Sequence, residues 1–519
     1  AIEEVQVVVA PFDVRQTNFI GGGINAITKS GTNTFRGTAY TYYRNQDMRG
    51  NRINGEDLGA RSDESKTTYG FTLGGPIIKN KLFFFVNYEK EKTPGEVIKY
   101  RAREDGEDAK GMVSRTLKSD MEKVYNHLKD KYGYDAGSYT NFPADEENTK
   151  LLARIDWNIT DRHRLSLRYN NTKNTAWNAP NGNSSDTGYR LNNTYRVGTQ
   201  SMAFANSMYS MDNKVQSWAA DLNSRFTDKI SNQLLFTYTN IEDMRGTNSS
   251  PFPFIDIMAG KDENGNQKQS RQSAALYMSA GYELFTYNNG VKNKITNITD
   301  NFTFFTGNHK LTAGLSYEHQ FANNAYMRNG TGYYRYNSLE DFLSGAAPES
   351  FALTYGFNGV ANPNAQVTFN QLGFYAQDEW NLGNSLKLTY GIRFDNLMFD
   401  NDDLQRNDAI YELDFDGQHI DTGKWPDSRW QISPRIGFVW DVFKDKSLKV
   451  RGGTGVFTGR LPLVFFTNMP TNASMVQNSV TFKTQYDNGK VVGHDSRLDQ
   501  LAGGKSGRPI FSATLLKCL

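Results

Sequence analysis

Residues 369–399, FNQLGFYAQDEWNLGNSLKLTYGIRFDNLMF, hold the pattern that decides the fold of this chain. After a short turn at 381–384, apolar residues alternate with polar ones. One face of the stretch carries Leu386, Leu388, Tyr390, Ile392 and Phe394, and the other carries Lys387, Thr389, Gly391, Arg393 and Asp395. Because successive side chains of a β-strand point to opposite faces, the pattern predicts a strand with one apolar and one charged face.

The same hairpin unit, two alternating stretches joined by a turn of a few residues, recurs six times along the chain. The short turns lie at 79–81, 160–163, 227–229, 306–309, 381–384 and 443–446. The connections between hairpins are long and polar, at about 93–149, 175–213, 244–294, 323–368, 400–431 and from 459 onwards. Transmembrane β-barrels of the bacterial outer membrane have this construction, with short periplasmic turns and longer extracellular loops.

The alternation predicts about thirteen strands. They lie at 35–45, 66–78, 81–92, 150–159, 163–174, 214–226, 230–243, 295–306, 309–322, 369–381, 385–399, 432–443 and 446–458. Strands of soluble proteins are usually about 5–6 residues long, whereas a tilted strand needs about 9–11 residues to cross a membrane. In a soluble sandwich the apolar face would pack on a second sheet. Periodicity does not separate the two architectures, but strand length and loop polarity favour the barrel.

The composition agrees with a membrane barrel. Only 38% of the 519 residues are hydrophobic and the mean hydropathy is −0.64, yet 13% are aromatic. Low hydropathy with few aromatic residues would indicate disorder; here the aromatic residues allow each strand to bury area on one side. The sequence has no run of about 18 apolar residues, so it predicts no transmembrane helix.

Aromatic residues gather near the ends of several predicted strands, at Tyr42–Tyr43, Phe83–Phe85, Trp157, Trp380 and Trp440. In membrane barrels, girdles of aromatic residues lie at both membrane interfaces. The alternative is that these residues occur in strands because aromatic side chains favour strands in general.

One helix is expected in the first long connection. Its apolar residues recur at three- and four-residue spacing: Met112, Leu117, Met121, Val124, Tyr125 and Leu128. Gly133 then fits a C-cap. We expect this helix to pack over the loop region, with its apolar stripe used for local packing rather than for a partner.

The sequence shows no catalytic constellation, so we expect neither an enzyme nor a cofactor. The net charge is only +2, which gives no sign of nucleic-acid binding. Cys518 is the only cysteine, and the six histidines lie in unrelated elements without a zinc-binding pattern.

Acidic loops are the only candidates for a metal site. Asp400, Asp402 and Asp403 lie in one connection, and Asp262 and Glu263 lie in another. Calcium prefers oxygen-rich loops of this kind. The spacing does not match an EF-hand, so a solvated acidic loop is the favoured interpretation and calcium is the alternative.

The N-terminal residues 1–34 differ from the hairpin pattern. Gly21–Gly23 precede an alternating stretch at 24–28 that predicts a strand, and Gly31 with Asn33 fits a turn. The glycines do not form a phosphate-binding loop, because no Gly-Lys-Ser/Thr follows at the required spacing. They indicate a tight backbone crossing before a strand.

Several motifs resemble those of TonB-dependent outer-membrane receptors, in particular the Oar-like group that carries a carboxypeptidase-regulatory-like domain. The motifs are Pro11–Gln16, Phe19–Gly31 (FIGGGINAITKSG), Phe35–Gly37, Leu73–Ile77, Phe83–Phe85, Tyr132–Tyr134, Arg451–Gly453 and Phe457–Arg460. The resemblance implies that residues 1–34 are the C-terminal part of a plug domain. It places Gly21, Gly22, Gly23, Asn25, Lys29 and Gly31 at the junction between plug and barrel.

The resemblance also implies an all-β fold, a transmembrane antiparallel barrel of about 22 strands. Because only about thirteen strands are visible, we expect residues 35–519 to form an incomplete barrel with long extracellular loops. An open edge in lipid would leave backbone groups unpaired. The residues that would contact TonB are expected upstream of Ala1.

Two functions follow from the resemblance. The first is TonB-dependent import of a peptide, protein or glycan-like substrate through a plugged barrel, in contact with membrane lipid, the TonB complex and, as an open question, a surface lipoprotein. Loop aromatics are the substrate-binding candidates: Trp177, Tyr189, Tyr195, Tyr333, Tyr334 and Tyr336. The alternative for these residues is that they stabilise the loops internally. The second function is an outer-membrane adhesin or surface-assembly barrel without energised import. A soluble multi-sheet carbohydrate-active protein is a third interpretation.

Overall fold

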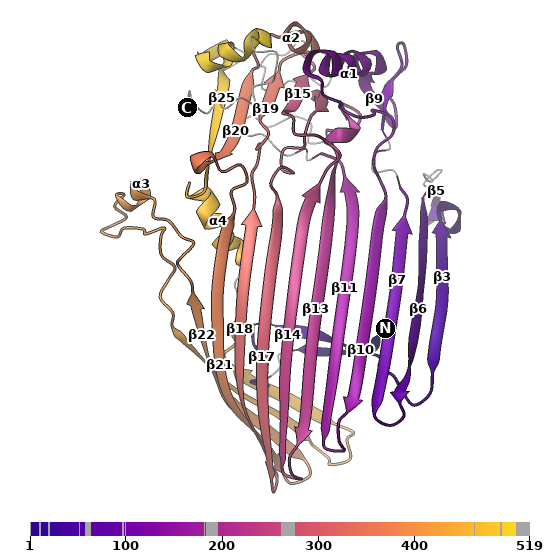
Figure 1. Ribbon diagram of the computed structural model, residues 1–519, viewed down its shortest axis with the longest axis vertical. Helices are drawn as coiled ribbons and strands as arrows, with labels where there is room; N and C mark the ends of the chain where they lie inside the picture. The colour runs from indigo at the N-terminus through magenta and orange to yellow at the C-terminus, as the bar shows by residue number, and fades with distance from the viewer. Residues whose placement is uncertain are drawn as a thin grey trace.

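A long antiparallel sheet that curves back on itself dominates the computed structural model (Figure 1). The structure describes residues 2–9, 12–18, 21–50, 52–57, 64–95, 98, 100–180, 182, 196–260, 276–460, 462–487 and 490–504. The short turns all lie at one end of this sheet and the long connections at the other, as the sequence predicts.

The sheet has thirteen strands, and each pairs antiparallel with its neighbours in chain order. They are β3 (Arg36–Asn45), β6 (Ser65–Ile78), β7 (Leu82–Thr93), β10 (Glu146–Asn158), β11 (His163–Asn178), β13 (Tyr209–Arg225), β14 (Ile230–Gly246), β17 (Gly290–Thr306), β18 (His309–Ala325), β21 (Ala365–Leu382), β22 (Leu386–Phe399), β23 (Trp430–Asp441) and β24 (Lys449–Gly455). The predicted number of strands is therefore confirmed. Several strands extend further towards the long connections than the alternation indicated; β13, for example, begins at Tyr209 rather than at 214.

The two faces of the sheet differ as the alternation predicts. Phe374 and Ile392 are 45% and 36% exposed on the convex face, whereas Gln377 and Arg393 are 5% and 1% exposed on the concave face. A soluble sheet buries its apolar face and exposes its charged one. An apolar face turned outward around a charged lumen is the arrangement of a membrane barrel.

Tryptophans lie on the outward face close to the short turns. Trp157 and Trp440 are 45% and 43% exposed, and each lies within two residues of the end of its strand. Trp380 lies two residues before the end of β21 and stacks on His309, with ring centroids 5.2 Å apart. This placement is that of an interfacial girdle.

The thirteen-stranded sheet is here called the wall. The long connections fold into a second, seven-stranded sheet beyond the wall, here called the outer sheet (Figure 1). In order it consists of β12 (Met202–Ala203), β16 (Leu276–Ala280), β15 (Phe254–Met258), β19 (Tyr333–Tyr336), β20 (Ser350–Gly356), β25 (Gln477–Asp487) and β26 (Lys490–His494). The sequence pattern did not reveal this sheet, and it corrects the description of these segments as polar loops.

Helix α1 (Lys118–Tyr132) covers the outer sheet and buries Met121, Val124 and Leu128. Gly133 ends it with a φ of 64°, which confirms the predicted C-cap. The helix begins later than predicted because residues 113–117 form β9 (Val113–Leu117), which pairs with β8 (Arg101–Arg103). Met112 is therefore outside the helix.

Smaller elements complete the fold. The N-terminal hairpin pairs β1 (Ile2–Val9) with β2 (Gly22–Thr28), and β4 (Arg52–Ile53) pairs with β5 (Glu56–Asp57). The helices α2 (Leu339–Ser344), α3 (Asp408–Tyr411) and α4 (Leu463–Asn472) lie towards the long-connection end, with 3-10 turns at 46–48, 205–207, 357–359 and 496–504. No helix in the described ranges is long and apolar enough to cross a membrane.

Candidate functional site

A short segment near the N-terminus, residues 12–18, crosses the lumen face of the wall and is here called the lumen segment. Val14 is fully buried in it. The Val14 N–H donates to Gln377 Oε1 of β21 at 2.9 Å, and its carbonyl accepts from the Arg393 guanidinium of β22 at 3.3 Å. The wall therefore binds this segment through its main chain.

Arg435 of β23 continues the same contact. Its Nη1 donates to the carbonyl groups of Asp13 and Gln16, both at 2.8 Å. The Asp13 carbonyl also accepts the Gln16 N–H of its own turn at 3.2 Å. Hydrogen bonds from a charged donor replace the water that these carbonyl groups lose in the lumen.

Phe12 fits against two glycines of the wall. A Cβ added to Gly437 would lie 2.7 Å from the Phe12 ring, and one added to Gly453 would lie 2.6 Å from it. Neither distance is compatible with van der Waals contact, so only glycine at these two positions leaves room for the ring. Phe12 also packs on Phe457, with ring centroids 6.1 Å apart.

The chain joins the first wall strand beside a second close approach. A Cβ at Gly31 would collide with the main-chain oxygens of Phe84 and Gly75. Two residues later, Asn33 Nδ2 donates to Asn80 Oδ1 at 2.6 Å, and the Asn80 N–H donates to Asn33 Oδ1 at 2.8 Å. The chain entering β3 is thus fixed to the short turn between β6 and β7.

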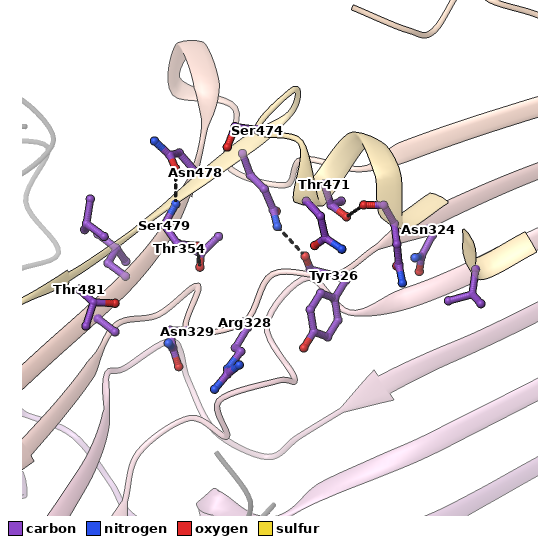
Figure 2. Close-up of a pocket in the computed structure, with 17 residues that line it drawn as sticks. Asn324, Tyr326, Arg328, Asn329, Thr354, Thr471, Ser474, Asn478, Ser479 and Thr481 are labelled. Carbon is purple, nitrogen blue, oxygen red and sulfur yellow. Dashed lines mark hydrogen bonds between the residues drawn. The ribbon is translucent and has the colours of Figure 1, made fainter. Parts of the chain in front are cut away.

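A cavity of about 760 Å³, here called the outer cavity, lies between α4 and the outer sheet (Figure 2). Its floor is α4, which packs on the lumen face of β21 through Phe466 and Met469 against Val367 and Phe369. Its walls are β20, β25 and the segment after β18. Cavities of about 300–1,000 Å³ are of the size that holds small ligands.

The lining of the outer cavity is made mainly of amides and hydroxyls. Its seventeen residues are Asn324, Tyr326, Arg328, Asn329, Ala352, Leu353, Thr354, Val464, Asn468, Thr471, Asn472, Ser474, Gln477, Asn478, Ser479, Val480 and Thr481. Some amides are used within the protein: Gln477 Nε2 donates to the Tyr326 carbonyl at 3.0 Å, and Asn324 Nδ2 donates to Thr467 Oγ1 at 3.2 Å.

Other polar groups of this lining can still donate or accept hydrogen bonds. In the described part of the chain, the side chains of Asn468 and Asn472 have no hydrogen-bond partner, and Gln477 Oε1 is a buried acceptor without one. A buried polar group without a partner costs about 1–3 kcal/mol. A ligand with its own donors and acceptors would remove this cost.

The charge of the cavity comes from a single residue. Among the described residues of the lining there is no carboxylate, and Arg328 is the only cation. Burial lowers the pKa of Arg328 and raises that of Tyr326. The Arg328 guanidinium lies 5.4 Å from the centre of the Phe285 ring. The cavity therefore disfavours a cationic ligand and suits a neutral or acidic one.

Comparison with known proteins agrees with this architecture. The family model of an outer membrane beta barrel domain matches residues 27–97 and 118–510. The chain belongs to this outer-membrane β-barrel family. Its location is accordingly the bacterial outer membrane, with the long connections on the extracellular side.

Two relatives extend the comparison. The TonB-dependent transporter Oar of Myxococcus xanthus is 26% identical over 182 residues, which are 33% of this chain and 16% of Oar. The crystal structure of the outer-membrane transporter YddB of Escherichia coli aligns with a TM-score of 0.54 and 13% identity, over 92% of this chain and 50% of YddB. The chain thus spans about half the length of YddB, and the likeness to YddB is one of fold.

Of the aromatic residues predicted to bind substrate, three lie on β19 of the outer sheet and not in the lining of the outer cavity. Tyr333, Tyr334 and Tyr336 are only 2%, 6% and 9% exposed. Trp177, at the outer end of β11, packs beside Ile98 and Met208. The described positions favour the alternative left open above, that these rings stabilise the connections. Tyr189 and Tyr195 lie outside the described residues.

The junction residues are placed as a continuous stretch. Gly22, Gly23 and Asn25 lie exposed on β2, Gly21 precedes it with a φ of 127°, and Lys29 is exposed after it. Of the six predicted junction residues, Gly31 is the one whose missing side chain is required by the barrel wall.

The acidic loop with Asp400, Asp402 and Asp403 is exposed. In the described ranges, no group of three or more His, Cys, Asp or Glu side chains is placed to hold a metal ion. Asp400 Oδ1 accepts the Asp402 N–H at 3.0 Å and so closes a turn, and calcium binding by this loop stays a prediction. Asp262 and Glu263 lie outside the described residues.

The residues of the outer cavity were not among those predicted from the sequence. Asn468 and Asn472 belong to α4, and Gln477 belongs to β25, and both elements follow the last predicted strand. The one available signal was the richness of this stretch in Asn and Thr after Leu463, without the alternation of a wall strand.

Proposed function

We propose that this protein is a TonB-dependent transporter that binds a polar substrate in the outer cavity and admits it to the lumen. The observation that carries the proposal is the combination of a hydrogen-bonding cavity at the extracellular mouth with a chain segment that crosses the lumen beneath it. The similarity to the TonB-dependent transporter Oar supports it.

The lining of the outer cavity indicates the class of substrate. Amide side chains donate and accept at once, so they match peptide groups and sugar hydroxyls alike. Asn468 and Asn472, one helical turn apart on α4, offer such groups to the cavity. Because none of the described lining residues is a carboxylate, we propose a peptide or glycan-like substrate that is neutral or acidic.

The N-terminal residues fit the role of a plug. We propose that residues 1–34 are the end of a plug domain and that residues from 35 onwards form the barrel. The hairpin β1–β2 and the lumen segment lie on the lumen side, held by Arg154, Arg393 and Arg435 of three different wall strands. In this proposal the TonB complex acts on the plug, and a surface lipoprotein is a further partner of the extracellular side.

Ligand binding tests the cavity. The purified protein in detergent would be titrated with a pool of short neutral and acidic peptides and with a set of neutral oligosaccharides, and binding measured by thermal shift. We expect one of the two sets to stabilise the protein and N468A/N472A to abolish the shift. The matched control is N362A, because Asn362 is exposed and outside the cavity. Equal shifts in both variants would contradict the proposal.

Uptake tests the energy source. Cells that express the protein would be given the ligand found above, labelled, with and without TonB. We expect uptake to stop without TonB while surface binding persists. If uptake were unchanged without TonB and cell attachment were lost on deleting the gene, the chain would instead be an adhesin or a surface-assembly barrel.

A further inference from the structure

A second cavity lies deeper in the lumen, near the short turns, and is here called the inner cavity. It has a volume of about 520 Å³. One side is formed by β2 and the residues after it, Ala26–Thr28, Ser30 and Gly31, and the other by the lumen faces of β10, β11 and β13. It is therefore the space between the N-terminal hairpin and one part of the barrel wall.

Three arginines line this space: Arg154 from β10 and Arg164 and Arg168 from β11. Arg154 and Arg168 are direct partners in the register of the two strands. Side chains of such a pair have Cβ atoms about 4.5–5.5 Å apart, and like charges at this distance repel each other. The barrel thus keeps two cations side by side in its lumen.

The carboxylates of the inner cavity do not neutralise all three cations. Asp156 is bound by Arg154, whose Nη2 lies 2.8 Å from Asp156 Oδ1. Asp221, the register partner of Ser166, accepts hydrogen bonds from Asn223 at 2.9 Å and from Gln233 at 3.2 Å, so it sets one negative charge beside Ser166 against the two positive charges of Arg164 and Arg168. Arg154 also donates to the Thr28 carbonyl of β2 at 2.8 Å, so its donors are directed towards partners that are already present.

Arg164 and Arg168 differ from Arg154 in their lack of partners among the described residues. Among the described residues, neither guanidinium has a hydrogen-bond or ion-pair partner, and the Nε of Arg168 is buried without one. Arg164 is exposed, whereas Arg168 is half-buried, and a cation that loses water without gaining a partner is costly. The two residues share one face of β11, four positions apart, with Ser166 between them. Their Cα atoms are therefore about 14 Å apart.

We propose that the inner cavity is an anion-binding site, in which Arg164 and Arg168, with the Ser166 hydroxyl between them, bind a carboxylate or phosphate group. Guanidinium groups bind such oxygens with two parallel hydrogen bonds. The anion would also relieve the repulsion between Arg154 and Arg168. The anion-binding site itself does not depend on the proposed function. Its use as a second binding site for an acidic substrate, after the outer cavity, rests on that function.

Calorimetry with a small anion tests the site directly. Inorganic phosphate would be titrated into the purified full-length protein in detergent at low ionic strength, because salt screens the interaction, and citrate would be titrated in a parallel series. We expect binding of at least one of the two anions and a loss of affinity of about tenfold or more in R164Q/R168Q. In R162Q the affinity should stay unchanged, because Arg162 lies in the exposed turn before β11 and donates to the Phe226 carbonyl.

Chemical modification gives a second measurement that needs no variant. An arginine-specific reagent would be applied with and without the anion, and each modified residue identified by mass spectrometry. We expect the anion to protect Arg164 and Arg168 and to leave Arg162 unprotected. Preference for phosphate over citrate, or the reverse, identifies the chemical source of the charge.

Three results would overturn the proposal. One is the absence of binding by both anions. Another is equal binding by R164Q/R168Q and R162Q. The third is protection of Arg164 and Arg168 without any added anion, which would show that another part of the full-length protein already fills the cavity. None of these results would affect the test of the outer cavity, which uses other residues and other ligands.

Discussion

Arg460 extends from the chain after β24 to Glu318 on β18, where its Nη2 lies 2.5 and 2.7 Å from the two carboxylate oxygens. Four strands of the wall sheet, β21, β22, β23 and β24, follow β18 in order, so this contact joins distant parts of the wall across the lumen. It also fixes the start of α4, because Leu463 lies three residues further along the chain.

Glu318→Gln should therefore loosen the floor of the outer cavity. The Glu318 side chain is 9% exposed and that of Arg460 is 36% exposed. Breaking a fully buried ion pair on one side costs about 3–5 kcal/mol of stability, and breaking an exposed one costs about 0–1 kcal/mol. For the Glu318–Arg460 pair we therefore expect a loss of stability between these values. Hydrogen exchange of residues 463–472 should become faster. The control is R406Q, which breaks an exposed pair with Asp408; similar exchange in both variants would disprove the link.

Gly437→Ala should displace the lumen segment. The new Cβ would lie 2.7 Å from the Phe12 ring, and a wall strand cannot shift as easily as a seven-residue segment. Hydrogen exchange of residues 12–18 should therefore become faster, while that of β23 stays slow. Gly23→Ala is the matched control, because a Cβ there meets no atom within 4 Å. Unchanged protection of the segment in G437A would show that Phe12 does not hold it.

Asp256→Asn should destabilise the outer sheet more than Tyr333→Phe. Asp256 is fully buried; it accepts from Arg196 at 2.8 Å, from Ser279 at 2.7 Å and from the Tyr333 hydroxyl at 2.8 Å. Removing its charge leaves the buried Arg196 without its partner carboxylate, at a cost of about 3–5 kcal/mol. Tyr333→Phe removes one hydrogen bond to this carboxylate, at about 1.5–3 kcal/mol.

Thermal unfolding and hydrogen exchange of residues 254–258 and 276–280 would show whether D256N destabilises the outer sheet more than Y333F. A smaller effect of D256N than of Y333F would mean that the ion pair does not hold the sheet together.

Acid should open the segment around β8 and β9. Arg101 lowers the pKa of Glu107 from 4.5 to about 2. Because the folded pKa is the lower one, the pair stabilises the segment fully above pH 4.5, and this contribution is lost as the pH falls towards 2. Pepsin cleavage within residues 100–117 should increase over that range. R101Q should be cleaved equally at both ends of the range, after correction with a reference peptide.

The wall was predictable from sequence because each of its strands meets lipid on one face and the lumen on the other. Phe394 and Arg393 are neighbours in sequence and lie on opposite faces, so the local alternation records the environment of each directly. The strand boundaries were less predictable at the end of the wall near the long connections. There β13 and β17 continue into the outer sheet region and no longer face lipid.

The outer sheet was not predictable for the opposite reason. All five residues of β15, Phe254–Met258, are buried, so both faces are equivalent and no alternation appears. Pairing partners are also distant in sequence: Thr354 pairs with Ser479, 125 residues away. The outer cavity depends on this pairing. The contacts of the lumen segment are just as distant in sequence, since Asp13 and Arg435 are 422 residues apart.

One contact sets a limit on how the lumen can open. Asn18, at the end of the lumen segment, forms a parallel bridge with Gly459, and α4 begins four residues later at Leu463. Four residues of fully extended chain span at most about 14 Å. As long as this bridge holds, the lumen segment cannot move further than this from the floor of the outer cavity. Any larger displacement has to break the bridge first or pull α4 away from β21, and either event would remove one boundary of the space in which we propose that the substrate lies.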